Sequence, residues 1–522
     1  MLVACRPGDR PLPSLPAPGP VVTESPSLST PPDAPLARRL RLAVDRPARL
    51  VASLAADDGE TTEVAFDAVS DAFDVPLLGF APDRDTIVTL TVIDPDTGVG
   101  AVLDPLLVHP DPLPPTFPTI EVLANDPDRR EPGYWLLSFE VPGGTSWLAV
   151  LDPGSPGSTG ACDVVWLYTG EIDWGDIRAT DRGTLFGLSA GAIEMDWLGG
   201  VIGRWFPGAS GEGGDVSIPW PLHHEGYVVG DGSVLSLVAS SAEVPAYPES
   251  YDDPTPTGPA TVADDHVVRF STSDGEVQLD RPLSTMLDTA RIGFGSLLPL
   301  VSGFDWVHAN AIVPWPGGGL LLSVRHQDAM VKLSDAGDVE WILGDPAGWN
   351  RTFTDRLLTP TDGTRWMYHQ HGPDVDEDGQ IVVFDNRMFT RTPYTPDTGE
   401  LPESRVVAYA VDAEARTVTE RWSWAPAEPL LSNALGNAAW LPVTGHALAD
   451  FGFLDGERGQ FNAELGLGRK SVRLIELDPT DPDPVVDVRL SNPIDVASEG
   501  VTAYRVFPIG SMYAGIATVT LR

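Results

Sequence analysis

The feature that most constrains the fold is a series of short apolar segments, separated by turn sequences, between residues 305 and 387. The segments are interrupted by Pro-Gly-Gly-Gly, Asp-Ala-Gly and Asp-Glu-Asp-Gly, which are typical of tight turns between strands. Ionisable side chains stand at the ends of the apolar segments; they are His308, Arg325, His326, His369, His371 and Arg387. Because loops at strand ends carry function on a rigid scaffold, this stretch predicts antiparallel β-structure and a functional site.

The same four-strand pattern recurs along the second half of the chain. Aligning His224, His308, His371 and Asn437 places each at the start of an apolar strand, before a glycine-containing turn and further strands. Four antiparallel strands repeated radially form a β-propeller, for which we predict six blades closed by the segment 504–508. The first strand of each propeller blade lines the central channel, so the aligned residues are expected at one end of it.

The predicted fold class is all-β, a six-bladed β-propeller preceded by a small N-terminal β-sandwich. Residues 37–112 contain short alternating segments, which predict a sandwich of the immunoglobulin or fibronectin type III kind. The proline-rich stretch 110–118 marks a domain boundary, and the propeller is predicted over 119–522. Residues 1–36 are rich in proline and serine, which predicts an extended tether.

The N-terminus suggests attachment to a membrane. The tetrapeptide ending at Cys5 resembles the lipobox of a bacterial lipoprotein, in which the cysteine is lipidated, although the upstream charged and apolar parts of a signal peptide are missing. We therefore expect a periplasmic or outer-membrane-anchored lipoprotein. The chain has no run of 18 apolar residues, so the membrane is expected to be reached only through the lipid.

Charge and cysteine content exclude several classes of function. The formal net charge of −42 argues against nucleic acid and anionic membrane surfaces as partners, because both require cationic patches. Two cysteines cannot form a disulfide framework. The motifs of P-loop, dinucleotide-binding and Ser-nucleophile enzymes are also missing.

The histidines and arginines point to chemistry on an anion. Imidazole can act as an acid, a base, a nucleophile or a metal ligand, and a guanidinium group such as that of Arg325 or Arg387 matches the oxygens of sulfate or phosphate. Two metal sites are alternatives. His369 and His371 lie on one face of a strand and could bind zinc. A calcium loop would use the carboxylates of Asp374, Asp376, Asp378 and Asp385.

The segments DWVHANAI, LLLSVRHQDAMVKLS, VEWILGD and IVVFDN, with the HQH strand, resemble the bacterial arylsulfate sulfotransferases. The resemblance implies a periplasmic enzyme that uses no PAPS, has a six-bladed propeller behind a small β-sandwich, and moves a sulfuryl group from a phenolic sulfate to a phenol through a sulfo-histidine. By analogy it also suggests a homodimer formed through the sandwich.

The resemblance implies roles for individual residues. His308, His371 and Arg387 match family motifs as catalytic residues, and His446 is expected to be the nucleophile because it is the one histidine downstream of the HQH strand. Substrate-binding roles are expected for four further residues: His224, Arg325, His369 and Asn386. Two other functions remain open, a propeller that binds a ligand without turnover and a metal-dependent hydrolase.

Overall fold

The computed structural model describes residues 19–57, 59–141, 145–154, 160–170, 174–209, 211, 215–455, 470–492 and 500–521. Over these residues the regular structure consists of β-strands and three short 3-10 helices, η2 (Leu283–Thr285), η3 (Arg325–Gln327) and η4 (Thr354–Arg356). None of the described helices is long or apolar enough to cross a bilayer. The all-β prediction is confirmed.

Six sheets of the described chain form the blades of a propeller, numbered here in chain order. Blade 1 contains β8 (Tyr134–Val141), β9 (Thr145–Asp152), β10 (Asp163–Tyr168) and β35 (Thr502–Ile509). Blade 2 contains β11 (Ile177–Ala179), β12 (Leu185–Ser189), β13 (Gly191–Met195), β14 (Val201–Pro207) and β15 (Val216–Ile218). Blade 3 contains β16 (Leu222–Val229), β17 (Ser233–Pro248), β18 (Thr257–Ser271), β19 (Val277–Pro282), β20 (Pro299–Leu300) and β21 (Gly303–Phe304).

The remaining three blades come from the stretch in which the repeat was recognised. Blade 4 contains β22 (Ala309–Pro314), β23 (Leu320–Val324), β24 (Ala329–Leu333) and β25 (Val339–Gly344). Blade 5 contains β26 (Thr359–Pro360), β27 (His371–Val375), β28 (Ile381–Asp385), β29 (Arg405–Asp412) and β30 (Thr417–Trp424). Blade 6 contains β31 (Asn437–Trp440), β32 (Ala447–Asp455), β33 (Lys470–Leu477), β34 (Val486–Ser491) and β7 (Thr119–Asn125).

The strands of the blade centres are nearly continuous apolar runs because both of their faces are covered; Lys332 and Asp385 are buried charged exceptions. All five residues of β24, Ala329–Leu333, are buried, and so are all five of β28, Ile381–Asp385. Neighbouring blades pack face to face, so a strand inside the ring has no solvated side and does not alternate between polar and apolar residues. The turns between strands, such as the one at 376–380, keep the polar residues.

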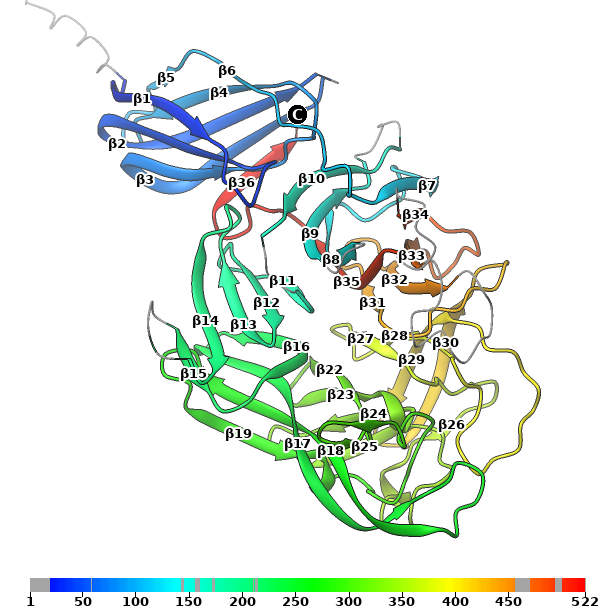
Figure 1. Ribbon diagram of the computed structural model, residues 1–522. Helices are drawn as coiled ribbons and strands as arrows, with labels where there is room; N and C mark the ends of the chain where they lie inside the picture. Colours follow the sequence, from blue (N-terminus) through cyan, green and yellow to red (C-terminus); the bar gives the residue numbers. More distant parts are fainter. Residues whose placement is uncertain are drawn as a thin grey trace, which may run out of the picture.

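The inner strands of blades 3, 4, 5, 6 and 1 contact one another in the order β16, β22, β27, β31 and β35, and blade 2 completes the ring because β12 contacts β16 and β11 contacts β35 (Figure 1). Strands from both ends of the propeller sequence close this ring. β35 pairs with β8 as the inner strand of blade 1, which confirms the prediction for residues 504–508, and β7 pairs with β34 as the outer strand of blade 6. Double closure of this kind leaves no free edge between the first and the last blade.

The N-terminal domain differs from its predicted limits. β1 (Val22–Ser29) pairs with β2 (Arg38–Ala56), so the predicted tether over residues 1–36 is wrong for its second half. β1 and β2 belong to one connected sheet of seven strands. The other five strands are β3 (Thr61–Leu77), β4 (Thr86–Ile93), β5 (Gly100–Val102), β6 (Leu106–Val108) and β36 (Ala517–Leu521). The propeller therefore ends before residue 522, because β36 returns to the first domain and pairs with β3 (Figure 1). Local strand patterns cannot reveal this long-range pairing.

One apolar cluster joins the N-terminal sheet to the propeller. Leu78 and Phe80 from the first domain belong to the same cluster as Trp166 in blade 1 and Tyr513 after β35. The hydroxyl group of Tyr513 accepts a hydrogen bond from the Leu78 amide at 2.6 Å and lies 3.2 Å from the Leu78 carbonyl oxygen, to which it donates. The C-terminal segment therefore fixes the first domain against the ring by both packing and hydrogen bonding.

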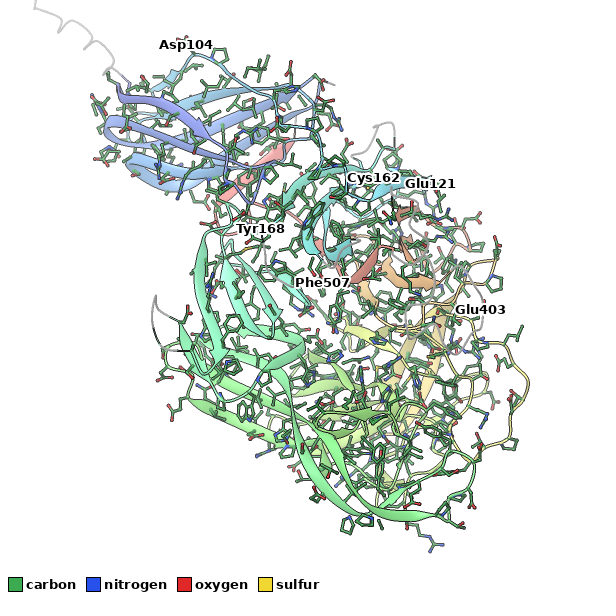
Figure 2. The ribbon with its side chains drawn as sticks, in the orientation of Figure 1. Asp104, Glu121, Cys162, Tyr168, Glu403 and Phe507 are labelled. Carbon is green, nitrogen blue, oxygen red and sulfur yellow. The ribbon has the colours of Figure 1, made fainter. Side chains whose placement is uncertain are left out.

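We expect Tyr513→Phe to lower the free energy of unfolding by about 1–3 kcal/mol, because the buried Leu78 amide loses its acceptor. Chemical denaturation measures the change. Tyr168→Phe is the matched control: Tyr168 belongs to the same cluster (Figure 2), and its hydroxyl group has no hydrogen-bond partner among the described residues. Equal effects of the two variants would contradict the role assigned to the Tyr513 hydroxyl group.

Candidate functional site

The functional side chains gather where the chain enters the inner strands. In four consecutive blades the residue just before or within the start of the inner strand has a left-handed backbone; these residues are His224 (φ 60°), His308 (φ 46°), His369 (φ 56°) and Leu435 (φ 60°). Such a conformation costs a residue other than glycine about 1–3 kcal/mol and persists where the surrounding structure fixes it. Three of the four positions hold histidine, so the strained positions and the ionisable groups coincide.

These histidines form a row of imidazole rings across blades 3, 4 and 5. The ring centroids of His224 and His308 are 5.0 Å apart, those of His308 and His326 are 4.7 Å apart, and those of His326 and His369 are 5.5 Å apart. The side chain of His308 is 24% exposed and His224 is also partly exposed, whereas His326 and His369 are buried. Imidazoles from three blades therefore lie together, in a row that contains His326 and His369 where the sequence predicted His371.

Two aspartates hold three of these rings through their Nδ1 atoms. His308 Nδ1 donates a hydrogen bond to Asp305 Oδ2 at 2.7 Å, and His326 Nδ1 donates to the backbone oxygen of Asp305 at 2.7 Å. His369 Nδ1 is 3.0 Å from Asp328 Oδ1. Because these acceptors carry no proton, each ring holds its proton on Nδ1 and its lone pair on Nε2 when it is neutral.

His371 differs from the other rings because a neutral amide holds it. Its Nδ1 is 2.7 Å from Asn386 Oδ1, and the Asn386 amide group is oriented by donating from Nδ2 to the carbonyl oxygens of Ser432 and Leu435. A carbonyl oxygen can only accept, so the proton of neutral His371 lies on Nδ1 and the lone pair lies on Nε2. Within the described residues, this Nε2 atom has no hydrogen-bond partner.

The surroundings keep several of these rings neutral. Burial holds the pKa of His371 well below its ordinary value, and the positive charge of Arg325 lowers it further, together with His308 and Arg505. Burial likewise lowers the pKa of His326, with His308 and Arg325 adding to the effect. His308 lowers the pKa of both His326 and His371, so these two rings share one electrostatic environment with it.

Two arginines bring positive charge to this environment. Arg325 follows β23 and donates to His326 Nε2 at 3.2 Å and to the backbone oxygen of Asn433 at 3.3 Å. Arg505, on β35, donates to the backbone oxygen of Asn310 at 2.6 Å and forms an ion pair with Glu225 at 2.7 Å. The Glu225 carboxylate offsets the charge of Arg505, whereas these two bonds of Arg325 go to uncharged acceptors.

The predicted alignment of the blades is wrong by two residues at His371 and at Asn437. Judged by the left-handed residues, His308 corresponds to His369, and His371 corresponds to Asn310 and Asn437. The Nδ2 atoms of both asparagines donate to backbone oxygens of the next inner strand, at Gln370 and Val506 respectively. β22 begins one residue after its left-handed residue, whereas β27 and β31 begin two residues after theirs, and an apolar pattern does not contain this information.

His446 does not lie in the candidate site, which corrects its predicted role as the nucleophile. It precedes β32, where Ala447 pairs with Trp440 at the end of β31 remote from Asn437. Its Nδ1 donates to Glu476 Oε1 at 2.7 Å, and Glu476 Oε1 also accepts the Glu131 amide at 2.6 Å. His446 is therefore a structural residue at the opposite end of blade 6.

Arg387 is directed toward a loop and not toward the imidazoles. Its guanidinium group forms an ion pair with Glu400 at 2.5 Å, and no hydrogen bond or ion pair joins it to a described histidine. Arg325 holds the position that was expected for Arg387, since it is hydrogen-bonded to His326 and influences His371. Both residues follow the second strand of a blade, so the repeat alone could not distinguish them.

The predicted calcium loop is not formed. Asp374 accepts the amides of Val375 and Trp440, and Asp376 accepts those of Asp378 and Gln380 within the turn. Asp385 lies at the other end of β28 and forms an ion pair with Arg405 at 2.8 Å. A calcium loop needs its carboxylates to converge on one point, which the intervening strand prevents.

One group of possible metal ligands is present among the described residues. Ligand atoms of Asp305, His308 and His326 lie within 4.8 Å of one another. The Nδ1 atoms of both histidines already donate to Asp305, at its carboxylate and at its backbone oxygen, so the three groups are paired with each other. The zinc alternative named His369 and His371, which have separate partners in Asp328 and Asn386.

Sequence reasoning named most members of the site but gave three no role. His326 stood out in the pattern as an ionisable group, whereas Asp305 and Arg505 were not considered. The acid three residues before His308 is a local signal that could have indicated a partner for this ring. Arg505 reaches the site only because β35 closes the ring, so no local signal exists for it.

The fold and this cluster together define a β-propeller that carries an imidazole and guanidinium site at one end of its inner strands. The family model of the arylsulfotransferases (ASST) matches residues 160–505, which is well over half of the chain. The chain therefore belongs to the arylsulfotransferase family.

Individual relatives match a smaller part of the chain. The arylsulfate sulfotransferase AssT of Escherichia coli O6:H1 is 28% identical over 149 residues, which is 25% of this chain and 25% of that protein. AssT of Lelliottia amnigena is 28% identical over 151 residues, with the same two shares. These matches span about a quarter of the relatives' length. Among solved structures, a streptogramin B lyase has a TM-score of 0.30 and 9% identity, covering 64% of this chain and 94% of the lyase.

We expect Asn386→Asp to raise the pKa of His371, because a carboxylate stabilises the protonated ring more strongly than the hydrogen bond to the neutral amide does. In the wild-type protein His371 should stay neutral down to a pH well below 6.5, and in the variant it should take up its proton at a higher pH. NMR titration of isotope-labelled histidine side chains measures both values. Asn350→Asp, in an exposed turn, is the control, and an unchanged His371 titration in Asn386→Asp would contradict the assigned contact.

Proposed function

We propose that this protein transfers a sulfuryl group from a phenolic sulfate ester to a phenol, and that Nε2 of His371 carries the group between the two half-reactions. The observation that carries the proposal is the pairing of His371 with a neutral amide. This pairing leaves a neutral ring with a free lone pair among the described residues, beside the charge of Arg325. Neutral imidazole is nucleophilic without further activation.

In the first half-reaction, His371 Nε2 attacks the sulfur atom of the donor. The new N–S bond forms as the S–O bond to the aryl group breaks, and the aryl oxygen leaves with the bonding electrons and acquires a proton. Negative charge on the peripheral sulfuryl oxygens is stabilised by fixed cationic and N–H donors that need no rearrangement. Arg325 and His308 are the groups of this kind that influence His371 electrostatically.

In the second half-reaction, the oxygen of a phenol acceptor attacks the same sulfur atom. The O–S bond forms as the N–S bond breaks, the phenolic proton passes to a base, and His371 regains its neutral state. The low pKa of His371 favours this step, because a weakly basic nitrogen is a good leaving group. No other reactant is consumed, so the cycle balances with one donor and one acceptor.

An aromatic wall beside the imidazole row supports a substrate with a phenolic ring. Phe389 lies 4.9 Å from the His369 ring and stacks on Phe294 at 4.4 Å, between ring centroids. The guanidinium group of Arg391 lies 5.0 Å from the centre of the Phe294 ring. Aromatic faces of this kind bind a further aromatic ring by stacking, and a nearby cation favours an anionic ester.

We expect His371→Ala to lower the rate of sulfuryl transfer from 4-nitrophenyl sulfate to phenol by at least about 10³-fold, because the nucleophile is removed. Mass spectrometry of wild-type protein with donor alone should detect a labile sulfuryl adduct on His371, and the variant should lack it. His446→Gln is the matched control, because it changes a buried histidine outside the site and should leave the rate unchanged. A folded wild-type protein without phenol-dependent transfer would contradict the proposal and favour a binding propeller without turnover.

We further propose that the protein works in the bacterial cell envelope, held there by a lipid on Cys5. The support is the lipobox-like sequence that ends at Cys5, which lies outside the described residues. In bacterial cells supplied with labelled palmitate, the wild-type protein should incorporate label and Cys5→Ser should not. Cys162→Ser is the control, since Cys162 is buried in the propeller. Equal labelling of wild-type protein and Cys5→Ser would contradict the lipid anchor.

A further inference from the structure

Two adjacent histidines in blade 3, His223 and His224, contact each other, and neither has a role in the two half-reactions described above. The Nδ1 atoms of His223 and His224 lie 2.6 Å apart, and the two rings meet edge to face with centroids 4.8 Å apart. Two imidazole nitrogens at this distance must hold one proton between them, because one has to donate and the other has to accept. Their protonation states are therefore linked.

The backbone creates this contact against the usual geometry of a strand. Neighbouring side chains of a regular strand point to opposite faces, which would keep the two rings apart. Here the pairing of β16 is irregular between His223 and Gly226, and His224 has a φ of 60°. Both deviations lie at the pair itself, so the strained backbone is what brings the rings together.

The pair links the imidazole row to a carboxylate of the same blade. His224 faces His308 at 5.0 Å and Tyr504 at 6.4 Å, between ring centroids. His223 Nε2 lies 3.5 Å from Asp265 Oδ1, on β18, and Asp265 Oδ2 accepts the amide of Ala309 at 2.5 Å. Asp265 thus contacts His223 directly and holds the backbone next to His308.

The charged groups around the pair favour a cation on His223 over one on His224. Burial opposes charge on His223, but Asp265, with a further contribution from Asp305, raises its pKa. Burial holds the pKa of His224 well below its ordinary value, and the nearby His223, His308, His371 and Arg505 lower it further. A proton that enters through His224 is therefore stabilised on the ring beside Asp265.

We propose that the His223–His224 pair, with Asp265, carries the proton of the sulfuryl transfer; this inference rests on the proposed function. When the donor's S–O bond breaks, His224 gives a proton to the departing aryl oxygen, and the proton on His223 Nδ1 passes to His224 Nδ1. When the acceptor phenol attacks, its proton passes to His224, and the proton on His224 Nδ1 returns to His223 Nδ1. His224 contacts substrate, and His223 acts through it as a positioning residue.

The dependence of the rate on the leaving group tests this proposal. His223→Gln keeps a hydrogen-bonding side chain but cannot hold the positive charge. We expect kcat/KM for phenyl sulfate to fall at least about tenfold more than kcat/KM for 4-nitrophenyl sulfate, because 4-nitrophenolate leaves readily without a proton and phenolate does not. The alkaline limb of the pH profile for phenyl sulfate should be lost or shift in the same variant, because the pair must be protonated to act as the acid in the first half-reaction.

Two further variants keep the test decisive. His266→Gln is the matched control, because His266 lies on β18 next to Asp265 but is hydrogen-bonded to Ser240 and Asp280; it should leave the donor ratio unchanged. Asp265→Asn retains an acceptor for the Ala309 amide while removing the carboxylate charge, and it should change the donor ratio in the same direction as His223→Gln. It provides the test if His223→Gln does not fold.

The outcomes separate this inference from the proposed function. Equal losses for both donors in His223→Gln and in Asp265→Asn would overturn the proton-carrying role while leaving sulfuryl transfer itself intact. A folded wild-type protein that transfers no sulfuryl group from either donor would overturn the proposed function, and with it this inference.

Discussion

The chemistry of the site depends on what each imidazole hydrogen-bonds through its Nδ1 atom. An aspartate carboxylate holds His308 and His369, a backbone carbonyl oxygen holds His326, a second imidazole holds His224, and an amide oxygen holds His371. A carboxylate favours the charged ring strongly, whereas an amide favours it less, so burial and the charge of Arg325 keep His371 neutral. Side chains of one type thereby acquire different roles, and His371 alone among these five has a neutral side-chain amide as its partner.

The propeller makes these pairings possible by bringing short segments from several blades to one end of the inner strands. His371 and its partner Asn386 belong to blade 5, Arg325 to blade 4 and Arg505 to the closing strand of blade 1. The left-handed residues at the strand entries give the rings their positions, at a cost in conformational energy that the closely packed blades sustain. The result is a cluster of cationic and neutral nitrogen groups inside a chain with a formal net charge of −42.

The sequence predicted much of the architecture because strand patterns and turns are local properties. The strands of blades 4, 5 and 6 lie where the repeat placed them, and the ring closes through the segment 504–508. The errors arise where long-range pairing or a special backbone conformation decides the outcome. β1 and β36 extend the N-terminal sheet beyond residues 37–112, and His371 follows the left-handed residue of its blade by two places, whereas His308 is that residue itself.

The sequence by itself determined the fold class, the blade pattern and the candidate residues His224, His308, Arg325, His369, His371 and Asn386. Only the tertiary structure decided their roles. It moved His446 to the opposite end of blade 6, directed Arg387 toward Glu400 and brought Arg505 and His223 into contact with the site. The physical reason is that residue type and spacing fix what a strand can be, whereas a proton's position depends on a hydrogen-bond partner that is usually distant in the chain.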